Sequence, residues 1–547
     1  MNAPATWAEA RPRLALVLLC LALFLPGFFT IPASDRDESR FAQATRQMVD
    51  SGDYVRIRVG EDDRNKKPVG IHWAQAAVVH AVEATGLGAR TDIWPYRVPS
   101  LLGAILAVLA TFQFGRNLVG RRAALLAGAM LAGCMVLVVE THIAKTDAAL
   151  LATVAAAMGL FGAAYLRPDA FTARHAAAFW GVLGLSILLK GPIGPMVPLL
   201  TGITLAIMDR GAPWLRALRP AWGPALSLGI AAPWMIAIGI ATEGRFFADA
   251  VGGDMIGKVG QGQEAHWGPP GYYIATFFIA AFPAAMLAIP AARQAWAERT
   301  LPATRFLIAW VVPTWLVFEA VATKLPHYTL PTYPAIMLLM AHWAMDPLRM
   351  PPARWMLWLM RGLFVLAAVG LAAVALVVPV AVTGHVVWTA LLAFPAAVLL
   401  LVLVWRAVGA GQWPRAAALS AVFAAPLYAT VLEGTLPRIE PLWVGPRLAA
   451  ALPPGLPSER FGITWHHEPS VQFAVGGGLR KLPDGAAAAA FLADAPGRVV
   501  AVEGRTLAAF QADITRRGLP VQTIGLVSGY NYSRGRPVTL HLYRTAP

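Results

Sequence analysis

A cluster of charged side chains follows the first apolar segment of the chain. The run Ser34-Asp35-Arg36-Asp37-Glu38-Ser39-Arg40 holds three acids and two arginines within seven residues, although only 14% of the sequence is charged. Ionisable groups at membrane depth are expensive and usually mark a pathway or a reaction site. A carboxylate can act as base for an incoming hydroxyl, and nearby cations can stabilise a departing phosphate. The run therefore predicts half of an active site.

The composition indicates a polytopic membrane protein. Of 547 residues, 57% are hydrophobic, and the mean hydropathy is +0.57; soluble domains are roughly 45–50% apolar. The net charge of +15 comes mostly from arginines that flank apolar runs, which favours an anionic membrane surface over nucleic acid as the partner. Cys20 and Cys134 both lie in apolar segments, which argues against a structural disulfide or a cysteine metal site.

Windows of about 20 apolar residues predict about thirteen membrane spans. They lie near residues 14–31, 98–115, 123–139, 148–166, 176–189, 192–208, 221–241, 271–291, 306–322, 329–345, 357–382, 386–405 and 416–434. The first segment resembles a signal peptide, but its length and the many later spans favour a retained anchor. The pair on either side of Lys190-Gly191-Pro192 could instead be one kinked helix.

An odd number of spans puts the two termini on opposite sides of the membrane. With the N-terminus in the cytoplasm, the arginine-rich connections fall inside, as the positive-inside rule requires. All lysines then fall outside, together with acids and histidines from six connections. Interfacial snorkelling explains any single lysine, but this mixture of residue types favours a reaction site. Residues 37–50 predict an amphipathic helix on the membrane surface, with Asp37 at the N-terminal end, where the helix dipole favours the carboxylate.

The character of the sequence changes near residue 436. The predicted domains are a membrane part, 1–435, whose first outer loop covers about 32–96, and a small soluble α/β domain, 436–547, on the outer side. Strand-like runs lie at 461–465, 498–502, 521–527 and 538–543, with helix-like stretches at 485–494 and 505–517. Asn531-Tyr532-Ser533 matches a glycosylation sequon, a match that is frequent by chance.

Several of these motifs together resemble a known enzyme family. Asp37-Glu38-Ser39-Arg40-Phe41, Lys66-Lys67-Pro68 and His72-Trp73 are similar to the first outer loop of the bacterial aminoarabinose (lipid A) transferases. Four later stretches match the same family in order: Lys145-Thr146-Asp147, Leu189-Lys190-Gly191-Pro192, His266 with Pro270-Gly271-Tyr272-Tyr273, and Lys324-Leu325-Pro326-His327-Tyr328. These enzymes belong to the polyprenyl-phosphate-sugar glycosyltransferases of the GT-C type, as do the protein mannosyltransferases.

The resemblance implies a multi-helix membrane fold with outer-face amphipathic helices and a soluble C-terminal domain. It also implies an inverting sugar transfer from a lipid monophosphate. The catalytic candidates it implies are Asp37, Glu38 and Asp147. Its candidates for binding the donor phosphate are Lys66, Lys67, Lys190, Lys324, His266, His327 and Tyr328. Further site candidates are Arg40, Lys145 and Tyr273. The family commonly has Glu-Lys-Pro-Pro where this chain has Lys66-Lys67-Pro68-Val69, so the choice between the two lysines stays open.

The expected partners are an undecaprenyl or other polyprenyl-phosphate sugar as donor and a lipid or glycolipid as acceptor, with lipid A as the first expectation. The expected location is the bacterial inner membrane, with the active site and the C-terminal domain in the periplasm. The sequence requires no cofactor; a divalent metal is possible, but no residue spacing argues for one. The alternatives are a protein O-mannosyltransferase and a flippase or transporter of lipid-linked sugars. A flippase is expected to carry ionisable residues through the depth of the bundle and often has repeated halves; neither is evident.

Overall fold

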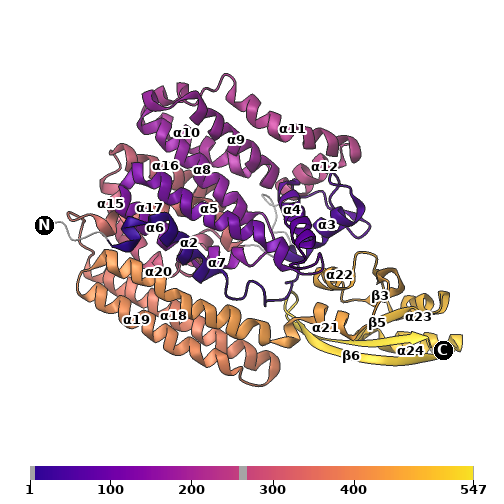
Figure 1. Cartoon of the computed structure of the whole chain (residues 1–547). Coiled ribbons are helices and arrows are strands. Elements are labelled where there is room, and N and C mark those ends of the chain that lie inside the picture. Colours follow the sequence, from indigo (N-terminus) through magenta and orange to yellow (C-terminus); the bar gives the residue numbers. More distant parts are fainter. Residues whose placement is uncertain (1–5, 258–267, 546–547) are drawn as a thin grey trace.

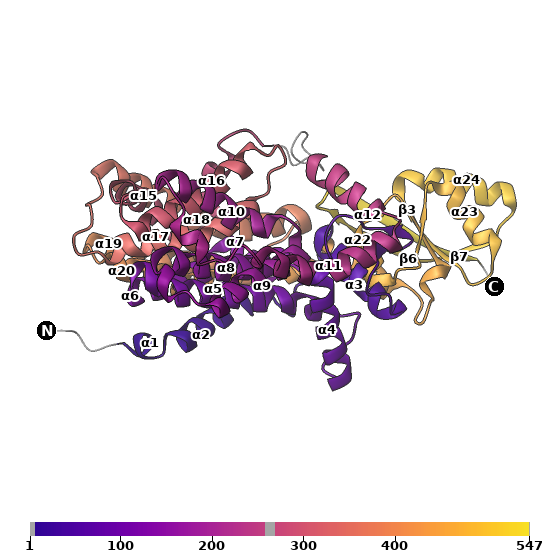
Figure 2. The same cartoon turned by 90° about the horizontal axis from the view of Figure 1, so that it is seen from above.

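The computed structural model describes residues 6–257 and 268–545. Figure 1 shows a large helical part that contains the N-terminus and, at the opposite end, a strand-rich part that contains the C-terminus. The short helices α3 (Asp37–Ser51) and α4 (Gly70–Thr85) lie between these two parts. In the view from above, α4 projects from one side of the body (Figure 2).

Seven of the described helical segments are long and apolar enough to cross a membrane, so the protein is a multi-pass membrane protein. They are α5 (Trp94–Val119), α8 (Asp147–Leu166), α11 (Gly223–Ala241), α16 (Pro302–Ala320), α18 (Arg354–Thr383), the segment Trp388–Gly409 that contains α19 (Ala393–Gly409), and the segment Trp413–Arg438 that contains α20 (Trp413–Ala429).

Two bent helix pairs raise the number of spans to as many as nine. The first joins α6 (Arg121–Gly133) to α7 (Met135–Thr141) at 60°, and the second joins α14 (Tyr272–Ala280) to the segment Ala284–Ala297, which contains α15 (Ala288–Ala297), at 120°. The other predicted spans fall on α2 (Pro12–Phe24), α9 (Ala173–Lys190), α10 (Ile193–Met208) and α17 (Tyr333–Met345). Every predicted span therefore falls on a helix or on one of these bent helix pairs, but the count of thirteen stays a prediction. The stretch at Lys190 forms two helices, not one kinked helix.

Close packing of α5 against α8 helps to position the candidate site. A Cβ atom added to Gly103 of α5 would lie 2.6 Å from the backbone nitrogen of Ala149, so only glycine permits this approach. The contact is close to Asp147, the first residue of α8. The N-terminal end of α8, with its carboxylate, is thereby held against the start of α5.

Helix α3 is amphipathic, as expected, but protein covers much of its surface. Its residues Phe41, Ala42, Ala44 and Met48 are at most 2% exposed, and it packs against α4 and against α22 (Pro469–Val475). Between α3 and α4, the chain forms a small hairpin of β1 (Arg58–Val59) and β2 (Asp62–Asp63). The apolar face predicted to meet the membrane is thus occupied by protein contacts.

The C-terminal region contains a five-stranded mixed sheet with the order β4-β3-β5-β7-β6. The strands are β3 (Phe461–Thr464), β4 (Arg480–Leu482), β5 (Val499–Glu503), β6 (Val521–Asn531) and β7 (Arg536–Thr545). The accompanying helices are α21 (Val444–Ala451), α22, α23 (Gly485–Asp494) and α24 (Leu507–Arg517). The α/β character agrees with the strand and helix patterns in the sequence, but these patterns missed β4, α21 and α22. The domain boundary at residue 436 stays a prediction.

Candidate active site

Asp37 is the first residue of α3 and faces a polar cavity. Its carboxylate lies 3.9 Å from Nη1 of Arg40 and 3.7 Å from Nη2 of Arg64. The side chain is 49% exposed, so it can reach a molecule that enters this space. A carboxylate at a helix N-terminus, next to two guanidinium groups, is stabilised in its charged form.

Glu38, the next residue, also borders this cavity, but its carboxylate is taken up by buried contacts. Its carboxylate forms an ion pair with Arg97 of α5 at 2.7 Å, and neither side chain is exposed. It also accepts hydrogen bonds from the backbone N–H groups of Ser34, at 2.8 Å, and Ala144, at 3.2 Å. Glu38 thus ties the first loop to α5 and to the segment before α8. These contacts support a positioning role for Glu38 rather than a direct role in catalysis.

A second charged cluster borders the same cavity as Asp37 and joins four parts of the chain. Nζ of Lys145 lies 2.9 Å from Glu140 of α7 and 3.6 Å from Asp147 of α8. Asp147 also accepts a hydrogen bond from Lys190, at the end of α9. His327 lies within 3.4 Å of Glu140 and 3.7 Å of Asp147. Two acids, two lysines and a histidine thus converge, and Lys190 and His327 reach this cluster from positions distant in the sequence from residues 140–147.

Two cavities meet at this cluster. The polar cavity, of about 270 Å³, is lined by Asp37 and Asp147 together, so the two carboxylates share one space. The apolar cavity, of about 330 Å³, lies mainly among side chains such as Met196, Trp234 and Phe318. Six residues line both cavities: Lys66, Lys67, Asp147, Lys190, His327 and Tyr328. We call these six residues the shared rim.

The pKa values show how the charges act on one another. Burial acts to raise the pKa of Asp37, but the positive charges of Lys145, Arg64 and Arg40 outweigh it and hold this pKa below its usual range. Burial, followed by the positive charge of Lys145, lowers the pKa of His327 to about 3. His327 is therefore neutral at pH 7, and the positive charge of the rim comes from lysines. Asp37 is ionised and can accept a hydrogen bond from a hydroxyl group.

The structure brings most of the predicted site residues to one place. The polar cavity is lined by ten of them: Asp37, Glu38, Arg40, Lys66, Lys67, Lys145, Asp147, Lys190, His327 and Tyr328. His266 lies outside the described residues. The roles given to these residues stay predictions.

Lys324 and Tyr273 are not brought to the polar cavity. Nζ of Lys324 donates hydrogen bonds to the backbone oxygens of Glu319, at 2.5 Å, and Val321, at 2.8 Å, so it satisfies carbonyl groups at the end of α16. The Lys324 ammonium also lies 5.6 Å from the ring centroid of Tyr273. The neighbours Thr323 and Leu325, in contrast, line the cavity. These contacts favour a structural role for Lys324 over phosphate binding.

Two residues of the site had been given no role from the sequence. Arg64, which follows the β1–β2 hairpin, contacts Asp37 and lies 5.2 Å from the ring centroid of Phe41. Its signal in the sequence was the charged run from Asp62 to Lys67. Glu140 is one of the acids in the six outer connections of the predicted topology, but only the fold shows that it contacts both Lys145 and His327.

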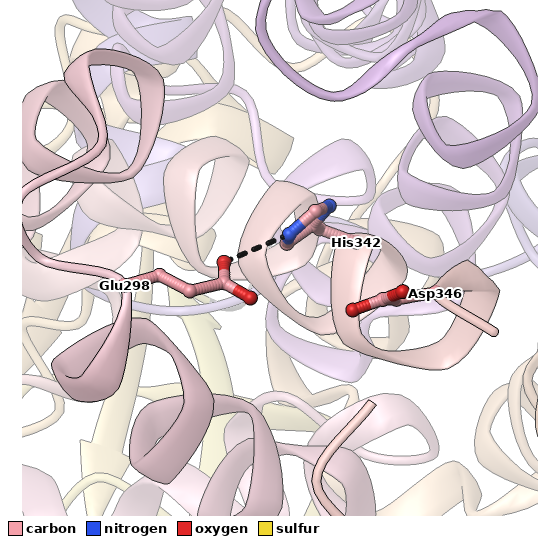
Figure 3. A group of neighbouring side chains, drawn as sticks. All are labelled: Glu298, His342 and Asp346. Carbon is pink, nitrogen blue, oxygen red and sulfur yellow. Dashed lines mark hydrogen bonds and ion pairs between the residues drawn. The ribbon is translucent and has the colours of Figure 1, made fainter. Parts of the chain in front are cut away.

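One group among the described residues has the composition of a metal site (Figure 3). None of its three residues lines either cavity. Glu298, His342 and Asp346 offer ligand atoms within 4.8 Å of one another. Hydrogen bonds account for this arrangement, because Nε2 of Gln294 donates to both carboxylates, and His342 lies 3.0 Å from Glu298. The group ties the ends of α15 and α17 together, and α17 separates it from His327 by about 20 Å.

Comparison with known proteins identifies the fold. Residues 66–236 match the family described as dolichyl-phosphate-mannose-protein mannosyltransferase. The undecaprenyl phosphate-alpha-4-amino-4-deoxy-L-arabinose arabinosyl transferase of Aeromonas salmonicida is 27% identical over 339 residues, which cover 60% of each chain. The enzyme of the same name from Pseudomonas paraeruginosa is 28% identical over 360 residues, which cover 64% of this chain and 61% of the relative. The matched stretch thus spans about 60% of the length of these curated relatives.

Solved structures match over nearly the whole chain. The crystal structure of ArnT from Cupriavidus metallidurans bound to undecaprenyl phosphate superposes with a TM-score of 0.75 and 19% identity, covering 98% of both chains. This chain has the ArnT fold. The oligosaccharyltransferase of Archaeoglobus fulgidus tethered to an acceptor peptide matches more distantly, with a TM-score of 0.51 and 9% identity, covering 87% of this chain and 64% of that chain. The resemblance to the polyprenyl-phosphate-sugar glycosyltransferases is confirmed by both sequence and fold.

Proposed function

We propose that this protein is an integral-membrane glycosyltransferase that moves a sugar from an undecaprenyl monophosphate donor to an acceptor hydroxyl, with inversion. The shared rim carries this proposal, because it joins an apolar cavity suited to a lipid chain to a polar cavity that contains a carboxylate. The similarity to arabinosyl transferases that carry undecaprenyl phosphate in their names supports the same donor.

In this proposal, the polyprenyl chain occupies the apolar cavity and its phosphate lies at the rim. Lys66, Lys67 and Lys190 supply positive charge there. Lysines can neutralise a leaving monophosphate as point charges. Lys190 is oriented by its hydrogen bond to Asp147, and its ammonium lies 5.5 Å from the ring centroid of Tyr328. The sugar then projects from the phosphate into the polar cavity, toward Asp37.

The proposed reaction is a displacement at the anomeric carbon. The acceptor oxygen forms a bond to that carbon, the bond from the carbon to the phosphate oxygen breaks, and polyprenyl phosphate leaves with the electron pair. Asp37 accepts the hydrogen bond of the attacking hydroxyl and then its proton. Because nearby cations lower the pKa of Asp37, it is a weak base, and its larger contribution is to orient the hydroxyl.

The remaining charged residues organise this centre. Asp147 and Glu140 hold Lys145, and Asp147 also holds Lys190. Without these acids, the lysines would repel one another in a space with little water. Arg40 and Arg64 flank Asp37 and are suited to an anionic group on the donor or the acceptor.

We further propose that the site faces the periplasm of a bacterium, from the inner membrane, with a cytoplasmic N-terminus. The excess of arginines in the opposite connections supports this orientation, and it puts the C-terminal region, as a domain of about residues 436–547, in the periplasm. Lipid A or a related glycolipid is the proposed acceptor, because the named relatives are arabinosyl transferases. The match of residues 66–236 to protein mannosyltransferases favours a protein acceptor as the second candidate.

Reconstitution of the purified protein tests the proposal. Vesicles would contain undecaprenyl-phosphate 4-amino-4-deoxy-arabinose and lipid A, and mass spectrometry would follow both lipids. A transferase releases undecaprenyl phosphate in amounts equal to the modified acceptor. Donor that crosses the bilayer unchanged, with no undecaprenyl phosphate released, would instead indicate a flippase. Replacing lipid A by an unfolded serine-rich peptide distinguishes the two acceptor classes.

A further inference from the structure

The residue before Asp37 has an unusual backbone conformation. Arg36 has φ 63° and ψ −114°, and no side chain caps the N-terminus of α3 there. A positive φ is uncommon for a residue with a Cβ atom, because the conformation is energetically unfavourable. Such a conformation persists only where the surroundings hold it. The direction in which Asp37 enters the cavity depends on this turn.

Three contacts that hold the turn come from the C-terminal region, and they add to the local hydrogen bonds from the Ser34 N–H to Glu38 and from the Ser39 hydroxyl to the Ser34 backbone oxygen. The backbone N–H of Asp35 donates to the hydroxyl of Tyr532 at 2.5 Å. The guanidinium of Arg36 donates to the backbone oxygen of Ser533 at 2.9 Å. The carboxylate of Asp35 accepts from the backbone N–H of Ser470 at 3.3 Å. Ser470 is in the first turn of α22, where no side chain of α22 itself caps the helix, so Asp35 does so from the first loop.

The other side of this contact is itself well ordered. Tyr532 and Ser533 lie at the tip of the β6–β7 hairpin, directly after Asn531. The amide of Asn531 is buried and donates to Glu468 at 2.9 Å, and Arg534 lies 3.5 Å from the same carboxylate. The hairpin tip and the start of α22 therefore form one unit. The buried amide also explains why the Asn531-Tyr532-Ser533 sequon is not open to glycosylation in the folded protein.

An apolar contact fixes this unit to the first loop. Phe473 of α22 is 3% exposed and belongs to a buried cluster with Ala33, Ala42 and Tyr96. Its backbone oxygen accepts a hydrogen bond from Arg46 of α3 at 2.8 Å. Side chains more than 370 residues apart in the sequence therefore pack together beside the polar cavity, which Asp35, Arg36 and Asp37 line in succession.

We propose that Tyr532 is a positioning residue, and that the hairpin tip and the start of α22 form a clamp that holds the Asp35-Arg36 turn and so aims Asp37 at the acceptor. This inference rests on the proposed function, because it takes Asp37 as the carboxylate that faces the acceptor. The clamp makes the C-terminal region part of the transfer machinery, although it supplies no group that contacts the reacting atoms. Without it, the turn relaxes and Asp37 loses its alignment.

The test is Tyr532→Phe in the full-length protein, which keeps the ring and removes only the hydroxyl that accepts from Asp35. We expect kcat for sugar transfer to fall about tenfold, equivalent to about 1.4 kcal/mol. The KM for the undecaprenyl-phosphate sugar stays unchanged, because the shared rim is intact. Amide hydrogen exchange of residues 35–40 becomes faster. Tyr530→Phe, on the same hairpin, is the matched control and changes neither quantity.

Several results would overturn the clamp. They are a kcat within twofold of wild type, unchanged exchange of residues 35–40, or a loss of donor binding in proportion to the loss of rate. Asp37→Asn, measured in parallel, separates this inference from the proposed function. If Asp37→Asn is inactive while Tyr532→Phe turns over normally, the clamp alone is refuted. If Asp37→Asn keeps full activity, the proposed role of Asp37 is refuted, and hydrogen exchange still decides whether the clamp holds the turn.

Discussion

Substitution of two neighbouring carboxylates, Glu38 and Asp37, is expected to affect the stability of the protein differently. Glu38→Gln keeps the size of the side chain and removes its charge. Arg97 then remains fully buried without a counter-ion, although its guanidinium still donates to the backbone oxygens of Phe28 and Ile31 at 2.9 and 2.8 Å. Removing one partner of a buried ion pair costs about 3–5 kcal/mol. We therefore expect Glu38→Gln to lower the free energy of unfolding by about this amount.

Asp37→Asn has no such effect on stability, because the Asp37 side chain is 49% exposed to the cavity and its ion pairs are longer than 3.5 Å. Pairs of this kind contribute about 0–1 kcal/mol. Chemical unfolding of both variants in the same detergent, followed by tryptophan fluorescence, measures the difference. A double-mutant cycle with Arg97→Met isolates the coupling between Glu38 and Arg97.

Equal stability of Glu38→Gln and wild type would refute this interpretation of the buried pair. So would an additive double mutant, since additivity would mean that Glu38 and Arg97 do not depend on each other. Under either result, Glu38 would remain a catalytic candidate beside Asp37.

Two further predictions concern the shared rim and the clamp. Lys190→Met should weaken the binding of undecaprenyl phosphate at least about tenfold, since a hydrogen bond to a charged group contributes about 1.5–3 kcal/mol. Titration calorimetry measures this affinity. Lys324→Met is the control and should bind undecaprenyl phosphate as tightly as wild type. Burial raises the pKa of Asp35 from 3.8 to about 6, so the folded state holds the proton more tightly, and stability falls as pH rises from about 4 to 6. Asp35→Asn should therefore melt higher than wild type at pH 7 and equally at pH 4; identical melting curves at both pH values would contradict this.

The helices were predictable from the sequence because apolar windows of the required length are a strong signal. Each predicted span falls on a helix or on a bent helix pair, and the short break at Gly191-Pro192 separates α9 from α10. The number of these helices that cross the membrane depends on tilt and on bent pairs such as α6–α7, which composition does not determine. The burial of α3 against α22 depends on contacts between distant parts of the chain, and no local pattern reveals it.

The residues of the site were predictable as a group, because topology alone brings helix ends on one face together. The direction of single side chains was not. Successive residues of a helix point about 100° apart, so the carboxylate of Asp37 is open to the cavity while that of Glu38 is buried against Arg97. Likewise, Thr323 and Leu325 line the cavity, while Lys324 turns back to α16. The role of Tyr532 depends on the docking of the C-terminal region, which the sequence leaves undetermined.

The central claim is that Asp37 acts on the acceptor at a site where the donor is already bound. Single-turnover transfer by Asp37→Asn, together with its affinity for undecaprenyl phosphate, tests this claim most directly. We expect unchanged affinity and a rate lower by about 10²–10⁴-fold, as is typical when a positioned acid–base group is lost. Transfer at the wild-type rate, or a loss of donor binding that accounts for the whole loss of activity, would contradict it.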